Sequence, residues 1–263
     1  MSFKINFQPS PAALYFTVSE HLRGYSKQEE IKTVLSHVEF QVRKLFNIPA
    51  EFKFQLLNIF EEDLFSEQFK SVIRSDDPIY GINQLVQEGM KIQENSMLDL
   101  SFSFPHIPNN YSGFNTICIN TNYSLGVPAG FVIVFNRNNS IKLTGYSTDS
   151  EEFNKDIYIC GQVLNDLISK GIDVLVRESN YKAAVLYQMI DSSKKLKPLS
   201  AKEKRSKTMV GVECECGIFS RIEKMGYEFQ VQDKGKFVHF TIANYPTHSK
   251  ELIEMLADRV AAL

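Results

Sequence analysis

Cysteine and histidine are the side chains best suited to binding a metal, and both occur in the last 50 residues. Cys214 and Cys216 flank Glu215, and His239 and His248 follow further along the chain. A structural zinc site usually draws its four ligands from two closely spaced pairs. The chain has no second cysteine pair, and the two histidines do not follow at zinc-finger spacing. The sequence therefore predicts no metal site.

Histidine could also act as a catalytic base beside a nucleophile. The chain has five histidines, His21, His37, His106, His239 and His248. They are dispersed along the sequence, and none stands in a recognisable nucleophile–base arrangement. We therefore expect surface or capping roles for them.

The segment 112–136 holds the most distinctive pattern in the chain. Gly126, Pro128 and Gly130 follow Tyr123 closely and precede the apolar run 131–136. Glycine and proline mark turns, so the composition alone indicates a turn that leads into a buried strand.

In its wider context this turn resembles the class V aminotransferases, which are fold-type I enzymes dependent on pyridoxal phosphate (PLP). Residues 112–136 are most similar to the phosphoserine aminotransferase branch, where a strand ends in Ser-x-Gln-Lys-Gly-x-Gly-x-Pro-Ala-Gly and a buried strand follows. Here the turn reads Asn-Tyr-Ser-Leu-Gly-Val-Pro-Ala-Gly from Asn122, so Tyr123 stands at the position of the lysine. Asp99 stands at the aspartate of the family's Asp-Ala-Thr-Ser, which pairs with the pyridine nitrogen of the cofactor.

Both ends of the chain carry the same resemblance. Residues 5–14 and 45–49 are similar to the opening of the family, and residues 157–171 to the helix that leads into its small domain. Residues 205–208 and 242–251, the latter reading Ile-Ala-Asn-Tyr-Pro-Thr-His-Ser-Lys-Glu, are similar to its C-terminal domain. The resemblance covers roughly 200 residues.

The lysine of the family forms a Schiff base with the cofactor and moves the proton at the substrate carbon. Tyr123 cannot form an imine, and its phenol, with a reference pKa of about 10, is a poor base at neutral pH. A shift of register does not restore the lysine, because no lysine occurs between Lys91 and Lys142. We therefore expect no catalytic residue at Tyr123.

Three further positions depart from the family. Thr241 replaces an arginine whose guanidinium would grip the substrate carboxylate with two hydrogen bonds. Glu151 and Glu152 fall where an Asn-Thr-Pro segment of the partner subunit holds the cofactor phosphate, and their charge would repel it. Lys27 is the one basic group kept from the family's Ser-His-Arg-Ser opening, and is the expected substrate-binding remnant.

The chain is also shortened between the strand that ends near Phe60 and the strand that starts near Met97. By comparison of lengths, roughly a hundred residues of the family are absent there. That region supplies the phosphate-binding loop, the aromatic side chain that stacks on the cofactor and several strands. We therefore expect Asp99 and Asn122 to be remnants of a cofactor site.

Charge and composition exclude several classes of protein. The net charge is −2, from 29 basic and 31 acidic residues, which does not suit a nucleic-acid or anionic-membrane surface. No apolar run reaches the roughly 18 residues of a membrane span, and no signal-peptide pattern opens the chain. The four cysteines are too few for a disulfide framework and suit a reducing compartment. We expect a cytoplasmic protein.

Apolar periodicity predicts the elements that carry these residues. Helical patterns lie at 27–46, 151–170, 172–190, 215–225 and from Thr247 onward, with shorter ones around 62–72 and 81–94. Strand patterns lie at 53–60, 97–104, 114–120, 131–136, 208–213 and 237–243, and residues 194–207 are expected to form a solvated connection.

Alternating helices and strands predict an α/β protein. The resemblance implies a shortened fold-type I aminotransferase framework, with a mixed, mostly parallel sheet flanked by helices and a smaller C-terminal α/β domain. We place a reduced large domain, including the N-terminal segment, at 1–150 and the small domain at 151–263.

The leading functional hypothesis is a degenerate member of the family that keeps the fold, binds no cofactor and has a binding or regulatory role as a homodimer. One alternative is an active PLP-dependent transaminase for an amino acid/2-oxo acid pair, with Lys91 or Lys142 supplying the amine. Another is non-covalent binding of a small phosphate or carboxylate metabolite at a site lined by Asp99, Asn122, Tyr123 and Lys27.

Overall fold

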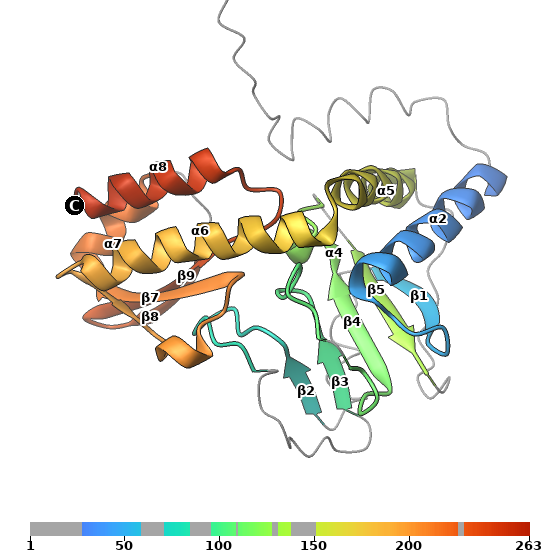
Figure 1. Ribbon diagram of the computed structural model, residues 1–263, viewed down its shortest axis with the longest axis horizontal. Helices are drawn as coiled ribbons and strands as arrows, with labels where there is room; N and C mark the ends of the chain where they lie inside the picture. Colours follow the sequence, from blue (N-terminus) through green and yellow to red (C-terminus); the bar gives the residue numbers. More distant parts are fainter. Residues whose placement is uncertain are drawn as a thin grey trace, which may run out of the picture.

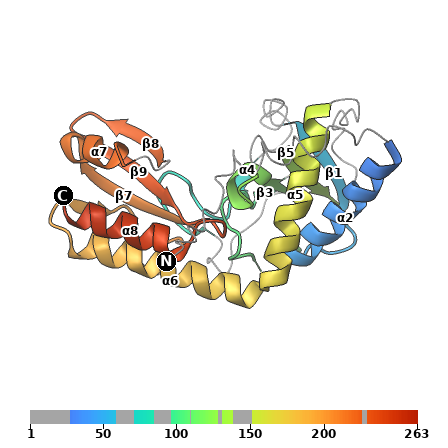
Figure 2. The same ribbon diagram turned by 90° about the horizontal axis from the view of Figure 1, so that it is seen from above.

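The computed structural model describes residues 28–58, 71–84, 96–108, 110–127, 131–137, 151–225 and 229–263. These residues form two units that lie side by side, each a β-sheet with helices packed on it (Figure 1). Seen from above, helix α6 (Ile172–Ser192) runs along the second unit, and helix α5 (Glu151–Lys170) lies over the first (Figure 2).

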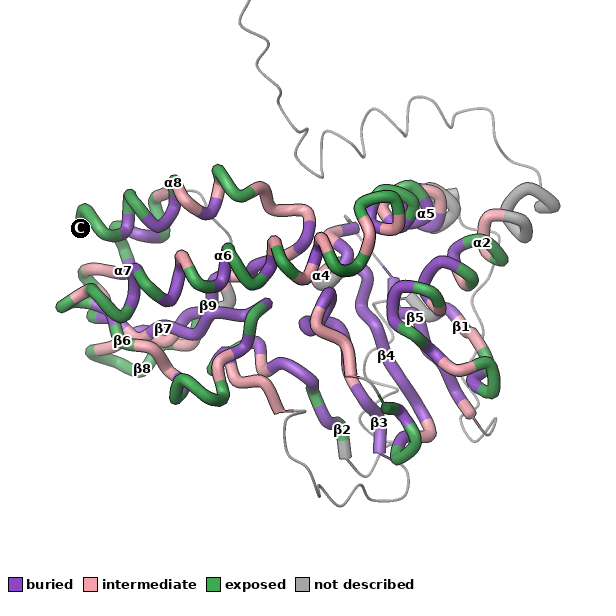
Figure 3. The backbone as a smooth tube through the Cα atoms, in the orientation of Figure 1, coloured by how far each residue is buried: buried purple, intermediate pink, exposed green. Residues whose placement is uncertain are grey.

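The first unit is built on a mixed five-stranded sheet in the order β1-β5-β4-β3-β2. Its strands are β1 (Lys53–Asn58), β2 (Ser71–Arg74), β3 (Ser96–Asp99), β4 (Thr116–Asn120) and β5 (Phe131–Asn136). Strands β2, β3 and β4 are parallel, whereas β5 is antiparallel to both β1 and β4. Every residue of β4 and β5 is buried, as their unbroken apolar sequences predicted (Figure 3).

Helix α2 (Gln28–Phe46) packs against α5, and both contribute apolar side chains to the core of the first unit. Val38, Val42 and Leu45 recur at helical spacing on α2 and are buried. The helix ends at Asn47, which adopts the left-handed conformation with φ 50° just before Ile48 and a proline.

The second unit is built on an antiparallel sheet in the order β6-β7-β9-β8. Its elements are β6 (Leu196–Pro198), the 3-10 helix η2 (Lys202–Lys204), β7 (Met209–Glu215), α7 (Cys216–Glu223), β8 (Phe229–Lys234), β9 (Phe237–Ala243) and α8 (Lys250–Ala261). Alternate residues of β7 and β9, such as Val212 and Phe240, pack in a core with α6 and α8. Gly211 and Thr241 lie on the opposite face of this sheet.

The two sheets are joined by residues 75–84, which we call the crossing segment. The segment follows β2 of the first unit and hydrogen-bonds to the second, where the Ser206 amide donates to the Gly81 carbonyl at 2.9 Å. Gly81 has φ +62°, and a Cβ there would lie 2.4 Å from the amide nitrogen of Gly211. The approach of the two backbones therefore requires glycine at position 81.

The structure confirms the predicted α/β class and the mixed sheet flanked by helices. It confirms the long helices at 27–46, 151–170 and 172–190. The strand expected at 97–104 ends at Asp99 and gives way to turns, and the last helix is capped by Ser249 rather than beginning near Thr247.

Three strands differ from the prediction. Strand β8 was not predicted, and β6 lies within the expected connection at 194–207. Strand β2 overlaps the helical pattern at 62–72, and most of that pattern, like most of 81–94, lies outside the described residues.

The domain boundary at residue 150 stays a prediction. Helix α5 begins just after it, yet Ile157 and Leu164 of that helix belong to the core of the first unit. The apolar cores change from the first unit to the second within α6, between Leu175 and Ala183.

Candidate functional site

Asp99 and Tyr123 come from the ends of neighbouring strands. Asp99 is the last residue of β3, and Tyr123 lies in the short helix α4 (Thr121–Ser124), which follows β4 directly. Because β3 and β4 are parallel, both residues lie at the same edge of the sheet. In open α/β sheets this carboxyl edge is where ligands bind.

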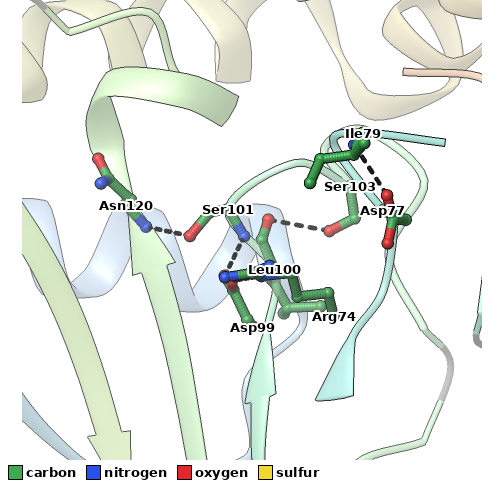
Figure 4. A network of polar contacts seen from close by, with 8 residues as sticks. All are labelled: Arg74, Asp77, Ile79, Asp99, Leu100, Ser101, Ser103 and Asn120. Carbon is green, nitrogen blue, oxygen red and sulfur yellow. Dashed lines mark hydrogen bonds and ion pairs between the residues drawn. The ribbon is translucent and has the colours of Figure 1, made fainter. Parts of the chain in front are cut away.

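Hydrogen bonds fix the end of β3 to the end of β4 (Figure 4). The Asp99 carboxylate accepts from the Ser101 amide at 2.9 Å, and the Ser101 hydroxyl accepts from the Asn120 amide at 2.8 Å. Arg74, at the end of β2, lies 3.4 Å from Asp99 through its Nε atom. The Asp99 side chain is 12% exposed and already has a cationic neighbour from this chain.

The turn that follows β4 is closed by its own polar groups. The Asn120 side chain accepts from the Asn122 amide at 3.0 Å and caps α4. The Thr121 hydroxyl donates to the Phe131 carbonyl and accepts from the Phe131 amide, both at 2.9 Å. These bonds join the two ends of the turn and leave Asn122 exposed on it.

The Tyr123 ring stacks on the ring of Phe102, with ring centroids 4.6 Å apart and planes 30° apart. The Phe102 carbonyl in turn accepts a hydrogen bond from the Thr208 hydroxyl of the second unit. Tyr123 is thus packed against a segment that is anchored to both units.

Thr241 lies on β9 and is buried. Its hydroxyl donates a 2.6 Å hydrogen bond to the carbonyl of Pro78 in the crossing segment. Asp77 shapes the segment there, since its carboxylate accepts from the amides of Ile79 and Tyr80 at 2.8 and 2.7 Å. The crossing segment therefore covers the face of β9 that carries Thr241.

Lys182 is a buried lysine of α6, but its amine has a structural role. It donates hydrogen bonds of 2.8 Å to the carbonyls of Tyr245 and His248. Burial lowers the pKa of Lys182 to about 8. Burial lowers the pKa of His248 to about 4, with a further contribution from Lys182. The hydrogen bonds of Lys182, and the contact of the His248 ring with the Ala243 carbonyl, hold the loop before α8 in place.

The structure brings Asp99, Asn122 and Tyr123 together at one sheet edge and places Thr241 on the other unit. Lys27 lies outside the described residues, as do Lys91 and Lys142. Glu151 and Glu152 form the first turn of α5, where only the backbone is described.

The sequence did not reveal three residues that contact Tyr123, Asp99 and Thr241. The sequence pattern places Phe102 in a strand and indicates no role for Arg74. Pro78 carried a usable signal, because Asp77 followed by proline is typical of a turn.

These residues do not fit PLP held as an imine. Position 123 carries a phenol and not an amine, its ring stacks on Phe102, and the Asp99 carboxylate at the same sheet edge is paired with Arg74.

Cys214 and Cys216 lie at the end of β7 and the start of α7. Cys214 is buried in β7, and the Cys216 thiol donates to the carbonyl of Gly235 at 3.0 Å. In the described part of the chain, no group of three or more His, Cys, Asp or Glu side chains is placed to hold a metal. None of the helices in these ranges is both long enough and apolar enough to cross a bilayer.

No protein-family profile matches the sequence, and no curated protein matches it significantly. Solved structures do match. The structure is similar to a phosphoserine aminotransferase from Cytophaga hutchinsonii with a TM-score of 0.75 and 14% identity, over 94% of this chain and 93% of that one. The chain has the fold of the phosphoserine aminotransferases.

Two more distant enzymes share this aminotransferase fold. A PLP-bound phosphoserine aminotransferase from Trichomonas vaginalis has a TM-score of 0.67 at 13% identity, over 91% of this chain and 89% of that one. An alanine–glyoxylate aminotransferase from Nostoc sp. has a TM-score of 0.70 at 10% identity, over 94% and 91%. The class V, fold-type I resemblance seen in the sequence is confirmed at the level of the fold, which at such identities does not carry the activity.

Proposed function

We propose that this chain keeps the aminotransferase fold without imine chemistry and acts by binding, as a homodimer. The observation that carries the proposal is Tyr123 in α4, directly after β4 and at the same sheet edge as Asp99. A lysine there would supply the amine for a Schiff base, whereas a phenol cannot.

The second unit supports the same conclusion. Thr241 cannot grip a carboxylate as an arginine does, and its hydroxyl already donates to Pro78. A substrate anion at this point would meet the Pro78 carbonyl, which repels it. The lysine position and the arginine position are thus altered together.

Dimerisation is the inherited property we propose the chain retains, because fold-type I proteins are typically homodimers. Its role would be binding or regulation, in association with a second copy. A reducing, cytoplasmic setting suits the four cysteines, which are free thiols, three of them buried. Light scattering of the purified protein after gel filtration tests this part, and a monomer at micromolar concentration would contradict it.

The chemical part is tested by adding PLP to the purified protein. We expect no absorbance band of an internal imine that borohydride bleaches, and no amino-group transfer from glutamate to a 2-oxo acid. Transfer that is lost on Lys91→Ala or Lys142→Ala would instead establish the active transaminase.

A second candidate function is non-covalent binding of a small phosphate or carboxylate metabolite at the same sheet edge. The exposure of Asn122 beside the half-buried Tyr123 favours it. A metabolite at a hundred times its dissociation constant should add about 2.7 kcal/mol to the free energy of unfolding. A thermal-shift screen, repeated on Asn122→Ala, tests this.

A further inference from the structure

A shallow depression lies on the second unit, between the C-terminal half of α6 and the segment that follows β6. Its volume is about 620 Å³, within the range of small-molecule sites. It is lined by Ala184, Tyr187, Gln188, Asp191, Ser192, Lys202, Arg205 and Lys207. It shares no residue with the aminotransferase position at Asp99, Tyr123 and Thr241.

The floor of the depression is held in one arrangement. The guanidinium of Arg205 lies 4.5 Å from the centre of the Tyr187 ring and bonds Asp191 with two hydrogen bonds of 2.7 and 2.8 Å. The Tyr187 hydroxyl donates to the Ser206 carbonyl at 2.9 Å. The Arg205 side chain is only 9% exposed, so it is packed among its neighbours as well as paired with Asp191.

The backbone that carries the rim is also anchored. Lys202 lies in η2, and the Lys204 carbonyl accepts from the Asn83 amide of the crossing segment at 2.9 Å. Arg205 forms an isolated antiparallel bridge with Ile82. The basic rim is therefore preorganised, which lowers the entropy cost of binding a ligand.

Positive charge gathers at this rim. Residues 194–207 hold seven basic side chains and one acidic one, Glu203, in a chain of net charge −2. Asp191 neutralises Arg205, but Lys202 and Lys207 are exposed and form no ion pair with any side chain that the structure describes. The depression therefore has a net positive charge from two lysines that are not neutralised by these neighbours.

We propose that this depression binds a small soluble molecule through a phosphate group. Lys202 and Lys207 neutralise the dianion, since an ammonium group acts as a point charge on phosphate. Gln188 and Ser192 on the facing turns of α6 offer hydrogen bonds to the rest of the molecule. The site shares no residue with Asp99, Tyr123 or Thr241, so it does not depend on imine chemistry.

Calorimetry with pyrophosphate as the probe tests the site at constant ionic strength of about 0.15 M, where charges beyond about 8 Å are screened. We expect Lys202→Gln/Lys207→Gln to weaken binding by about tenfold or more. The matched control, Lys194→Gln/Lys224→Gln, removes the same charge outside the depression and should change affinity by less than about twofold.

Amide chemical shifts of the wild-type protein test the location without any variant. We expect pyrophosphate to shift the amides of residues 202–207 and of the last turns of α6. Equal weakening by the two double variants, an absence of saturable binding, or shifts confined to other segments would overturn the proposal.

Discussion

The ring of Tyr123 stacks on the ring of Phe102 with centroids 4.6 Å apart. Under the proposed function, this position is the one that would carry the cofactor lysine in an aminotransferase. Here the side chain at position 123 is half-buried and packs against the turn that follows Asp99.

A double-mutant cycle measures this stack. Leucine at Tyr123, at Phe102 and at both positions should give a coupling of about 0.5–1.5 kcal/mol in the free energy of unfolding, the usual contribution of an aromatic pair. Urea unfolding of the four proteins provides the values. A coupling indistinguishable from zero would mean that Tyr123 does not pack on Phe102 in solution.

The hydrogen bond from Thr241 to Pro78 should stabilise the join between the two units. Thr241→Val keeps the volume and leaves the buried Pro78 carbonyl without its donor, at a cost of about 1–3 kcal/mol. Thr116→Val is the matched control, because Thr116 is buried but its hydroxyl has no hydrogen-bond partner among the described residues. The control should be neutral or stabilising in the same unfolding assay. Equal losses of stability in Thr241→Val and Thr116→Val would show that the hydrogen bond to Pro78 does not stabilise the protein.

The approach of Gly81 to Gly211 should tolerate no side chain. In Gly81→Ala the new Cβ would meet backbone atoms at 2.4 and 2.5 Å, so we expect a loss above about 2 kcal/mol or a failure to fold. Gly235 also has a positive φ, +78°, but open space around it, so Gly235→Ala should cost only about 1 kcal/mol. Thermal unfolding of both variants gives the comparison, and a mild effect of Gly81→Ala would contradict this packing.

The partly buried His248 should make the protein sensitive to acid. Its pKa is lowered from 6.5 to about 4, so below pH 6.5 the unfolded chain takes up a proton that the folded chain does not. Stability is therefore lost as the pH falls from 6.5 toward 4, by about 1–3 kcal/mol from this group. Asp76 acts in the opposite direction, because burial raises its pKa to about 6.

His248→Asn keeps a donor for the Ala243 carbonyl and removes the titrating ring. Urea unfolding at several pH values should show a smaller loss of stability below pH 6.5 than in the wild type. His37→Asn, at an exposed position on α2, removes a histidine outside this loop and serves as the control variant. Identical pH profiles for wild type and His248→Asn would contradict the assignment.

The long elements were predictable because their patterns are strong. Strand β5 is an unbroken apolar run, and α2 repeats its apolar residues at helical spacing. Strand β8 escaped prediction because only Phe229 and Val231 mark it, and Val231 is 51% exposed. A short strand at the edge of a sheet has too few buried residues to show its period.

The candidate site was predictable only in part. The motif placed Asp99 and Tyr123 at one sheet edge, because neighbouring parallel strands end together. The bond between Thr241 and Pro78 joins residues 163 positions apart, and only the fold brings them into contact. The turn at Asp77 could have been predicted from the sequence. Its contact with the face of β9 could not.

The most direct test of the central claim is to load the wild type and Tyr123→Lys with PLP, remove free cofactor, and record absorbance before and after borohydride. Mass spectrometry of the digested proteins then locates any reduced adduct. We expect no imine band in the wild type and no amino-group transfer in either protein, because both keep Thr241 in place of an arginine and Asp99 paired with Arg74. A stable imine in the wild type, fixed by borohydride at one lysine and accompanied by transfer from glutamate, would contradict it.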